Sequence, residues 1–230
     1  SSQAPLHYAI EIGNAELTLA LIEKGASLDI KNKDGKTPLH WAIQTENTEQ
    51  AHFLIEKGAD INVKNKDGDT PLHLAIGYDI NEIALAIINK GANLDTKDKD
   101  GKKPLQLALE NSNTEIALAL INKGANLDIQ DEYGKTPLHY AIQIGNTELA
   151  LTLINKGANL DMRDENDRPP LHWAIIYNRT EIALSLIDKG ANLDIQEKYG
   201  KTPVSLAAYI GQIEIALSLI DKGANLDIQE

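Results

Sequence analysis

Five histidines recur at a regular spacing and could, by residue type, hold a metal ion. Consecutive members lie 33 or 66 residues apart, at His7, His40, His73, His139 and His172. Zinc needs its ligands about 2 Å from a single ion, whereas stacked helices lie about 8–10 Å apart. Histidines on successive helices of a stack therefore cannot normally share a metal, and we expect a structural role for them.

A second regular column consists of aspartates and suggests calcium. Its members are Asp29, Asp95, Asp128, Asp161, Asp194 and Asp227. The same geometric objection applies, because calcium needs about 6–8 oxygen ligands around one ion. We expect these carboxylates to hold the backbone of a turn. Serine nucleophiles, glycine-rich phosphate loops and paired acids with a convincing base are absent from the sequence. We therefore predict no enzyme, no cofactor and no metal site.

The elements that position these columns are copies of a 33-residue unit. One proline marks each copy, at Pro5, Pro38, Pro71, Pro104, Pro137, Pro170 and Pro203. Copies at a fixed period indicate a repeat array. We place the repeats approximately at 1–33, 34–66, 67–99, 100–132, 133–165, 166–198 and 199–230, within a single domain that spans 1–230.

The residue pattern of each copy predicts two short helices followed by a turn. Thr37-Pro38 is a helix start, since threonine caps free N–H groups and proline fits the first helical position. A second start follows near Asn47, and the second helix ends at Gly58, a residue suited to a left-handed cap. Such short helices are marginal alone. They must therefore bury their apolar faces against neighbouring copies.

The motif Thr-Pro-Leu-His stands at residues 37–40, 70–73 and 136–139. With it the chain resembles the ankyrin repeat family along its whole length. The resemblance implies an all-α solenoid with β-hairpin tips, structural hydrogen bonds for the histidines, and a partner-binding concave groove lined by the outer side of the first helices. Lys103 and Pro169 depart from the threonine of the motif. Asp167 replaces a turn glycine, and we expect it to take the left-handed conformation.

Composition narrows the function classes. The net charge of −12 argues against general nucleic-acid binding, which needs a concentrated basic face. The absence of cysteine excludes disulfides and cysteine-ligated metals. No apolar run approaches the roughly 20 residues of a membrane span, so no membrane insertion is expected. The last repeat carries apolar residues like an internal one, including Ile215 and Leu217, so we expect the chain to be a fragment of a longer protein.

A partner-binding surface is predicted from helix geometry. At about 100° per residue, Trp41 and Thr45 face away from Leu39 and Ile43. Tyrosine and tryptophan anchor protein interfaces; alternatively, these rings only cover the seam between helices. Repeats six and seven are the strongest segment, and Leu107 and Asn111 of repeat four interrupt the stripe, which allows two patches. The predicted contact residues are Tyr8, Ile12, Trp41, Thr45, Tyr78, Tyr140, Ile144, Trp173, Ile176, Tyr177, Tyr209 and Ile210.

Two further surfaces are weaker candidates. Lysines at the early tips could steer an acidic partner, although solvated turn residues are the simpler interpretation; they are Lys31, Lys33, Lys36, Lys64, Lys66, Lys97, Lys99 and Lys102. A leucine column on the second helices, interrupted by His52, suggests altered packing between repeats or a convex interface for self-association. Its members are Leu19, Leu85, Leu118, Leu151, Leu184 and Leu217.

Asn62 is the exception in the aspartate column. Leu54, Asp60, Ile61 and Asn62 resemble the motif that asparaginyl hydroxylases recognise in ankyrin domains. The simpler interpretation is that Asn62 only forms a hydrogen bond within the tip.

The function expected from these patterns is a non-catalytic scaffold that binds a protein partner through the concave groove and the hairpin tips. The heavy use of Ile, Asn and Lys resembles ankyrin proteins of AT-rich intracellular bacteria, which suggests an effector acting on host proteins and an intracellular location, cytoplasmic or inside a host cell. The alternative is a targeting or substrate-recruiting arm of a larger enzyme or adaptor. A structural spacer is a third interpretation.

Overall fold

The computed structural model describes residues 3–229, in which fourteen α-helices and no β-strand are found. By packing, the chain divides into unit 1, up to Ala125, and unit 2, from Asn126 onward. Unit 1 holds α1 (Pro5–Glu11), α2 (Ala15–Glu23), α3 (Pro38–Gln44), α4 (Thr48–Glu56), α5 (Pro71–Gly77), α6 (Asn81–Asn89), α7 (Pro104–Glu110) and α8 (Thr114–Asn122). Unit 2 holds α9 (Pro137–Ile144), α10 (Thr147–Asn155), α11 (Pro170–Ile176), α12 (Thr180–Asp188), α13 (Pro203–Ile210) and α14 (Ile213–Asp221).

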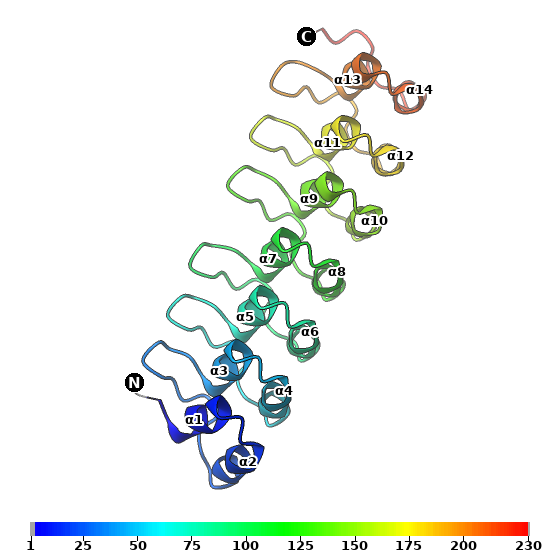
Figure 1. Cartoon of the computed structure of the whole chain (residues 1–230). Coiled ribbons are helices and arrows are strands. Elements are labelled where there is room, and N and C mark those ends of the chain that lie inside the picture. Colours follow the sequence, from blue (N-terminus) through cyan, green and yellow to red (C-terminus); the bar gives the residue numbers. More distant parts are fainter. Residues whose placement is uncertain (1–2, 230) are drawn as a thin grey trace. The chain divides into compact units, whose positions relative to one another are not determined.

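Each unit is a stack of helix pairs (Figure 1). The odd-numbered helices, here called first helices, pack side by side, and each also packs on the even-numbered second helix that follows it. The core of the second pair illustrates why: Leu39 and Ile43 of α3 and Leu54 of α4 are buried. Burial of these short apolar faces between neighbours stabilises helices that would be marginal in isolation. None of the described helices combines the length and the apolar character needed to cross a membrane.

Helix ends follow the local signals in the sequence. In α3, the Thr37 side chain accepts the His40 N–H while the His40 ring accepts the Thr37 N–H, which is a capping box. Four of the seven described second helices begin after a capping asparagine, as where Asn47 caps α4. Gly58 follows α4 with φ +88°, a conformation that costs glycine little. Asp167 has φ +59°, so the left-handed turn expected without a glycine is confirmed.

The expected β-hairpin tips are not confirmed, because the segments between helix pairs contain no strand among the described residues. In the second tip, Asn65 N–H donates to the Asp69 carbonyl, and Gly68 N–H returns to the Asn65 carbonyl. The Asn65 side-chain oxygen accepts two further backbone N–H groups, those of Asp67 and Asp69. The Asn65 side chain thus pairs with backbone N–H groups that would bond to a partner strand in a β-hairpin. We call these segments tip loops.

Candidate functional site

The residues expected to contact a partner lie on the outward side of the first helices, which we call the first-helix face. In α3, Leu39 and Ile43 are buried, whereas Trp41 is half-buried and Thr45 is exposed. The Thr45 hydroxyl donates to the Trp41 carbonyl at 2.9 Å, so its hydrogen is used within the helix. The exposed apolar members are Tyr8, Ile12 and Tyr78 in unit 1 and Ile144, Ile176, Tyr177, Tyr209 and Ile210 in unit 2.

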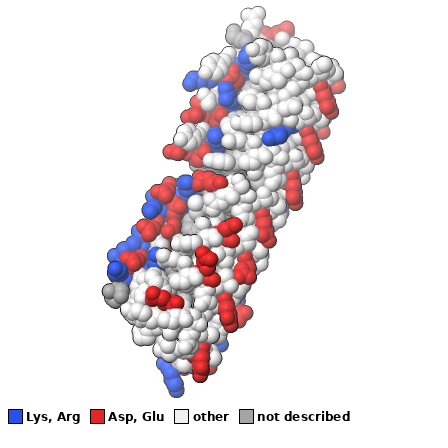
Figure 2. Space-filling model, in the orientation of Figure 1, with Lys and Arg blue, Asp and Glu red and all other residues white. Residues whose placement is uncertain are grey.

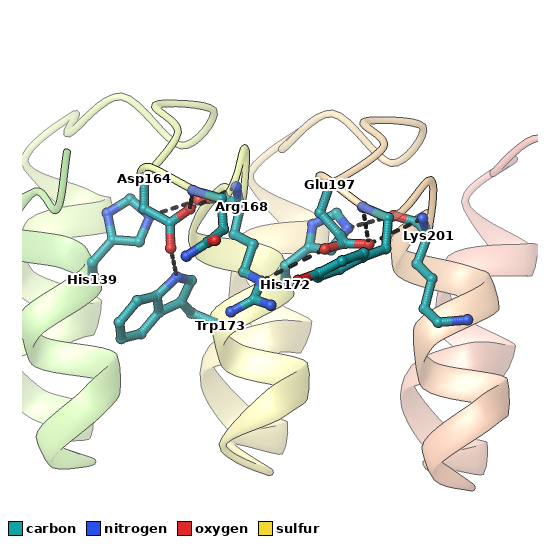
Figure 3. Close-up of polar contacts among 9 residues, drawn as sticks. His139, Asp164, Arg168, His172, Trp173, Glu197 and Lys201 are labelled. Carbon is teal, nitrogen blue, oxygen red and sulfur yellow. Dashed lines mark hydrogen bonds and ion pairs between the residues drawn. The ribbon is translucent and has the colours of Figure 1, made fainter. Parts of the chain in front are cut away.

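Trp173, one of the predicted contact residues, does not lie at the surface. Its side chain is only 6% exposed, and its indole N–H donates to Asp164 Oδ2 at 2.9 Å (Figure 3). Tyr177 stacks on the indole with ring centroids 5.4 Å apart, and the His139 ring meets it edge-on at 5.5 Å. Trp173 therefore packs beneath Tyr177, and Tyr177 is the ring that is exposed on the first-helix face.

Trp41 occupies the matching position in unit 1 but lacks this hydrogen bond. The residue nine positions earlier is Asn32 instead of an aspartate, and its side-chain oxygen accepts the N–H groups of Asp34 and Lys36. Trp41 Nε1 is buried without a partner. The remaining polar end of an asparagine is a donor, which cannot serve an indole N–H.

A lysine lies among aromatic rings at the start of unit 2. Lys135 Nζ is 5.0 Å from the centroid of Trp173 and 5.9 Å from the centroids of Tyr133 and Tyr140. The Tyr140 hydroxyl donates to Asp131 Oδ2 at 2.8 Å, which fixes that ring. Cations are attracted to the faces of aromatic rings. The rings therefore position a cation at the edge of the first-helix face.

A pocket of about 300 Å³ in unit 2 is lined by Arg168, Ile176, Glu197, Tyr199, Lys201 and Leu206. The Glu197 side chain is buried, and its Oε2 lies 3.8 Å from Arg168 Nε (Figure 3). Its Oε1 accepts the backbone N–H groups of Tyr199 and Lys201, as the turn aspartates do in other tip loops. Lys201 Nζ sits 4.9 Å over the Tyr209 ring. The pocket thus combines apolar walls with two cations and one buried carboxylate.

The histidine column makes the structural hydrogen bonds that the resemblance implies. Nδ1 of His40 accepts the Thr37 N–H, so the ring proton lies on Nε2, which donates to the Asp69 carbonyl in the next tip loop at 3.1 Å. The other four rings, those of His7, His73, His139 and His172, each bond the carbonyl 29 residues later. Burial lowers the pKa of all five rings, and that of His40 to about 4. Uncharged imidazoles thus link successive repeats.

Pro169 interrupts this pattern at His172. A proline has no N–H to donate and no side-chain oxygen to cap α11, so His172 Nδ1 is buried without a partner. Across the described residues, no group of three or more histidine, aspartate or glutamate side chains is placed to hold a metal ion.

Within both units, members of the aspartate column tie one repeat to the next, whereas Asp95 instead accepts a bond from Lys103 Nζ at 2.7 Å. Asp29 Oδ1 accepts the Asp60 N–H at 2.8 Å, 31 residues later. Asp128, Asp161 and Asp194 repeat this bond in unit 2. Asn62 plays the same part with its amide oxygen, which accepts the Asn93 N–H at 2.8 Å. Asn62 is nevertheless exposed.

Several tip lysines of unit 1 contact the neighbouring tip loop. Lys31 and Lys64 each donate to the carbonyl of the residue 33 positions later, Lys64 and Lys97, at 3.2 and 2.7 Å. Lys99 lies 3.7 Å from Asp67. Figure 2 shows basic and acidic side chains interspersed along the tip loops and acidic ones recurring along the second helices. The described tip loops therefore form no uninterrupted basic edge.

The leucine column on the second helices is mostly half-buried. Leu85, Leu118, Leu151 and Leu184 are partly covered by their neighbours, whereas Leu19 and Leu217 are 37% and 55% exposed. The coverage fits packing between repeats better than a continuous apolar strip for self-association.

Sequence reasoning missed the polar frame of the first-helix face, namely Asp131, Asp164 and Glu197 with Lys135 and Arg168. A register signal was available, because Asp131 and Asp164 each stand nine residues before a ring, Tyr140 and Trp173. The hydrogen bonds from Tyr140 to Asp131 and from Trp173 to Asp164 are visible only in the three-dimensional structure.

A family model described as ankyrin repeats in three copies matches residues 1–65, 62–131, 81–164, 123–197 and 145–230. No curated protein matches the chain. Among solved structures, the chain is similar to the crystal structure of the ankyrin repeat domain of Bcl-3, described as a unique member of the IkappaB protein family. The match has 24% identity and a TM-score of 0.74, and it covers 96% of this chain and 99% of that one. At this identity the likeness shows the fold alone.

Proposed function

This chain belongs to the ankyrin repeat family, and we propose that it is a non-catalytic scaffold that binds a protein partner through its first-helix face and the adjoining tip loops. The observation that carries the proposal is the exposed apolar surface of unit 2. Ile144, Ile176, Tyr177, Tyr209 and Ile210 are between 38% and 79% exposed. Exposed apolar surface beside charged groups is typical of protein interaction sites.

The anchors of the proposed interface are Tyr177 and Ile210, and Trp173 supports Tyr177. Tyr177 rests on an indole that is held by Asp164, so little side-chain entropy is left to lose when a partner binds. Pre-organised aromatic side chains are frequent hot spots. Trp173 thus contributes by positioning Tyr177.

The same face favours acidic groups on the partner. Lys135, Arg168 and Lys201 lie among or beside its rings, although the chain as a whole carries a net charge of −12. Local charge complementarity raises association rates and orients the partner. We therefore propose a partner segment that places carboxylates next to apolar side chains.

The test compares partner capture by the wild-type chain and by the double variant Tyr177→Ala/Ile210→Ala. We expect the captured partner to bind the double variant at least about tenfold more weakly, since hot-spot truncations cost about 2 kcal/mol or more. The matched control is Leu217→Ala, which removes an exposed apolar side chain from α14 and should leave capture unchanged. Identical partner sets and affinities for all three proteins would remove the site assignment.

A narrower proposal, a bacterial effector acting on host proteins inside a host cell, rests on residue usage. The full-length sequence and the protein's location during infection would test it. A catalytic or adaptor segment in the full-length chain would instead favour a targeting arm.

A further inference from the structure

The second helices α2 and α4 of unit 1 leave a cleft between them. Helix α2 lies less closely against α4 than α4 does against α6. The cleft has a volume of about 320 Å³ and a mainly apolar lining, within the range of small-molecule sites. Its lining residues are Ala15, Thr18, Leu19, Glu49, Gln50, His52, Phe53 and Glu56.

Departures from the repeat explain the opening. Where Thr18 stands, the other six copies have alanine, and where Gln50 stands, they have leucine or isoleucine. His52 interrupts the leucine column, and Phe53 replaces the small residue that follows it in the other copies. A polar pair and two ring side chains therefore meet where the other repeats pack aliphatic or small side chains.

One polar group in the cleft has no partner. Gln50 is only 3% exposed and Thr18 1%. The Thr18 hydroxyl lies 3.0 Å from the side-chain oxygen of Gln50, and the Gln50 amide nitrogen is buried with no hydrogen-bond partner. Whichever way the amide is turned, Thr18 holds one of its polar ends and the other end is unsatisfied. A buried amide in this state is costly to maintain.

The surroundings restrict what could satisfy that group. The walls are mainly apolar, so a ligand needs an apolar body. Glu49 and Glu56 lie on the lining and are exposed, which disfavours an anion through like-charge repulsion. Lys57 Nζ lies 5.3 Å from the centroid of the Phe53 ring, which disfavours a cation at that ring for the same reason. A hydroxyl or an amide can both donate and accept, so it can pair with either end of the Gln50 amide.

We propose that the cleft between α2 and α4 is a binding site for an uncharged, mainly aromatic small molecule that carries one hydroxyl or amide group. The ligand places its ring against Phe53, His52 and Leu19 and its polar group against Gln50. This site lies on the second helices and is independent of the first-helix face.

Three matched probes test the site on the whole chain: 2-naphthol, naphthalene, which lacks the hydroxyl, and 2-naphthoate, which is an anion. We expect 2-naphthol to bind at least fivefold more tightly than naphthalene, and 2-naphthoate to bind most weakly, in ligand-observed NMR titrations. Binding of 2-naphthol should also shift the Gln50 side-chain amide resonances. Absence of 2-naphthol binding, equal affinities for 2-naphthol and naphthalene, or an unmoved Gln50 amide would each overturn the proposal.

The double variant Thr18→Ala/Gln50→Ile provides the second arm. It carries the residue types of the other repeats at both positions, so it should fold at least as stably, which thermal unfolding checks. We expect it to lose the preference for 2-naphthol over naphthalene. Gln143→Ile, which removes an amide from α9 outside the cleft, should keep the preference. An unchanged preference in the double variant would contradict a role for Gln50.

Discussion

At the scale of single residues, the two tryptophans show how one atom decides what a side chain can do. Trp173 Nε1 donates to a carboxylate oxygen of Asp164, whereas Trp41 Nε1 is buried without a partner beside Asn32. The rings occupy equivalent positions, yet the first is buried and the second only half-buried. The acceptor nine residues earlier accounts for the difference in hydrogen bonding, because an indole can only donate. The stacked Tyr177, which has Thr45 as its counterpart beside Trp41, adds to the burial of the Trp173 ring.

Exchange of the two acceptors tests this explanation. Asp164→Asn should lower the free energy of unfolding by about 1–2 kcal/mol, because the Trp173 N–H loses a charged acceptor, and Asn32→Asp should raise it by about 0.5–1.5 kcal/mol. Urea unfolding followed by tryptophan fluorescence measures both. In a Trp173→Phe background the cost of Asp164→Asn should largely vanish. A cost of the same size in that background would locate the effect in the turn.

Asn62 leads to a second prediction at this scale. Its side chain is exposed and bonds the Asn93 N–H. If an asparaginyl hydroxylase recognises the motif around Asn62, incubation with this enzyme should add one oxygen atom to the chain. The intact mass measures this gain. Asn62→Gln should abolish the gain. An unmodified wild-type chain would leave Asn62 with its structural hydrogen bond alone.

At the scale of helices and turns, the fold depends on a Thr–His capping box that recurs at the first helices but is missing from some of them. In α3 and α5 the threonine and histidine satisfy each other's backbone donors, and the histidine then bonds the next tip loop. In α11, Pro169 keeps the helix start but removes the cap. His172 still bonds the Lys201 carbonyl at 2.9 Å, so the link between repeats survives.

Replacement of that proline should stabilise unit 2. In Pro169→Thr the new N–H can donate to His172 Nδ1 and the new hydroxyl can cap α11, each worth about 1 kcal/mol. Loss of proline rigidity in the unfolded chain opposes this by about 0.4–1 kcal/mol. We therefore expect a net gain of about 1 kcal/mol in the free energy of unfolding. Pro169→Ala, which supplies the N–H without the hydroxyl, separates the two contributions, and a loss of stability in Pro169→Thr would refute the account.

At the scale of the whole molecule, neutral buried histidines recur in both units and make stability depend on pH. Burial lowers the pKa of His40 from 6.5 to about 4. The unfolded chain then binds the proton more tightly than the folded one. The contribution of His40 is therefore fully present above about pH 6.5 and is lost as the pH falls toward 4. The other members of the column shift in the same direction.

Acid should accordingly destabilise the protein over that window. The lowered pKa of His40 alone corresponds to a difference of about 3 kcal/mol in the free energy of unfolding between pH values above 6.5 and below 4. Urea midpoints measured between about pH 7.5 and about pH 4.5 should fall steeply for the wild type. His40→Gln should be less stable at neutral pH but should show a shallower fall, while His52→Gln, outside the column, is the matched control. Equal slopes for the wild type and His40→Gln would contradict this role of the column.

The sequence by itself determined the repeat, the helix starts and the helix ends. The repeat is visible as a 33-residue period. The helix starts and ends depend on residues within about four positions of each other, such as Thr37 with His40, Asn47 with the first turn of α4, and Gly58 at its end. Local hydrogen bonds and backbone sterics decide them, so a linear pattern is sufficient. Asp167 belongs to this group, since its left-handed turn was expected from the same steric argument.

The tertiary structure alone decided which of these residues are exposed and which polar groups find partners. Helix periodicity placed Trp173 on the outer side of α11, but its burial depends on Asp164, Tyr177 and His139, which the turn, the helix and the neighbouring repeat bring together. The tips form loops without strands because side chains satisfy their backbone donors. The cleft between α2 and α4 arises where residues 32 positions apart, Thr18 and Gln50, meet. Such contacts depend on packing and shape complementarity across repeats, which a period in the sequence does not encode.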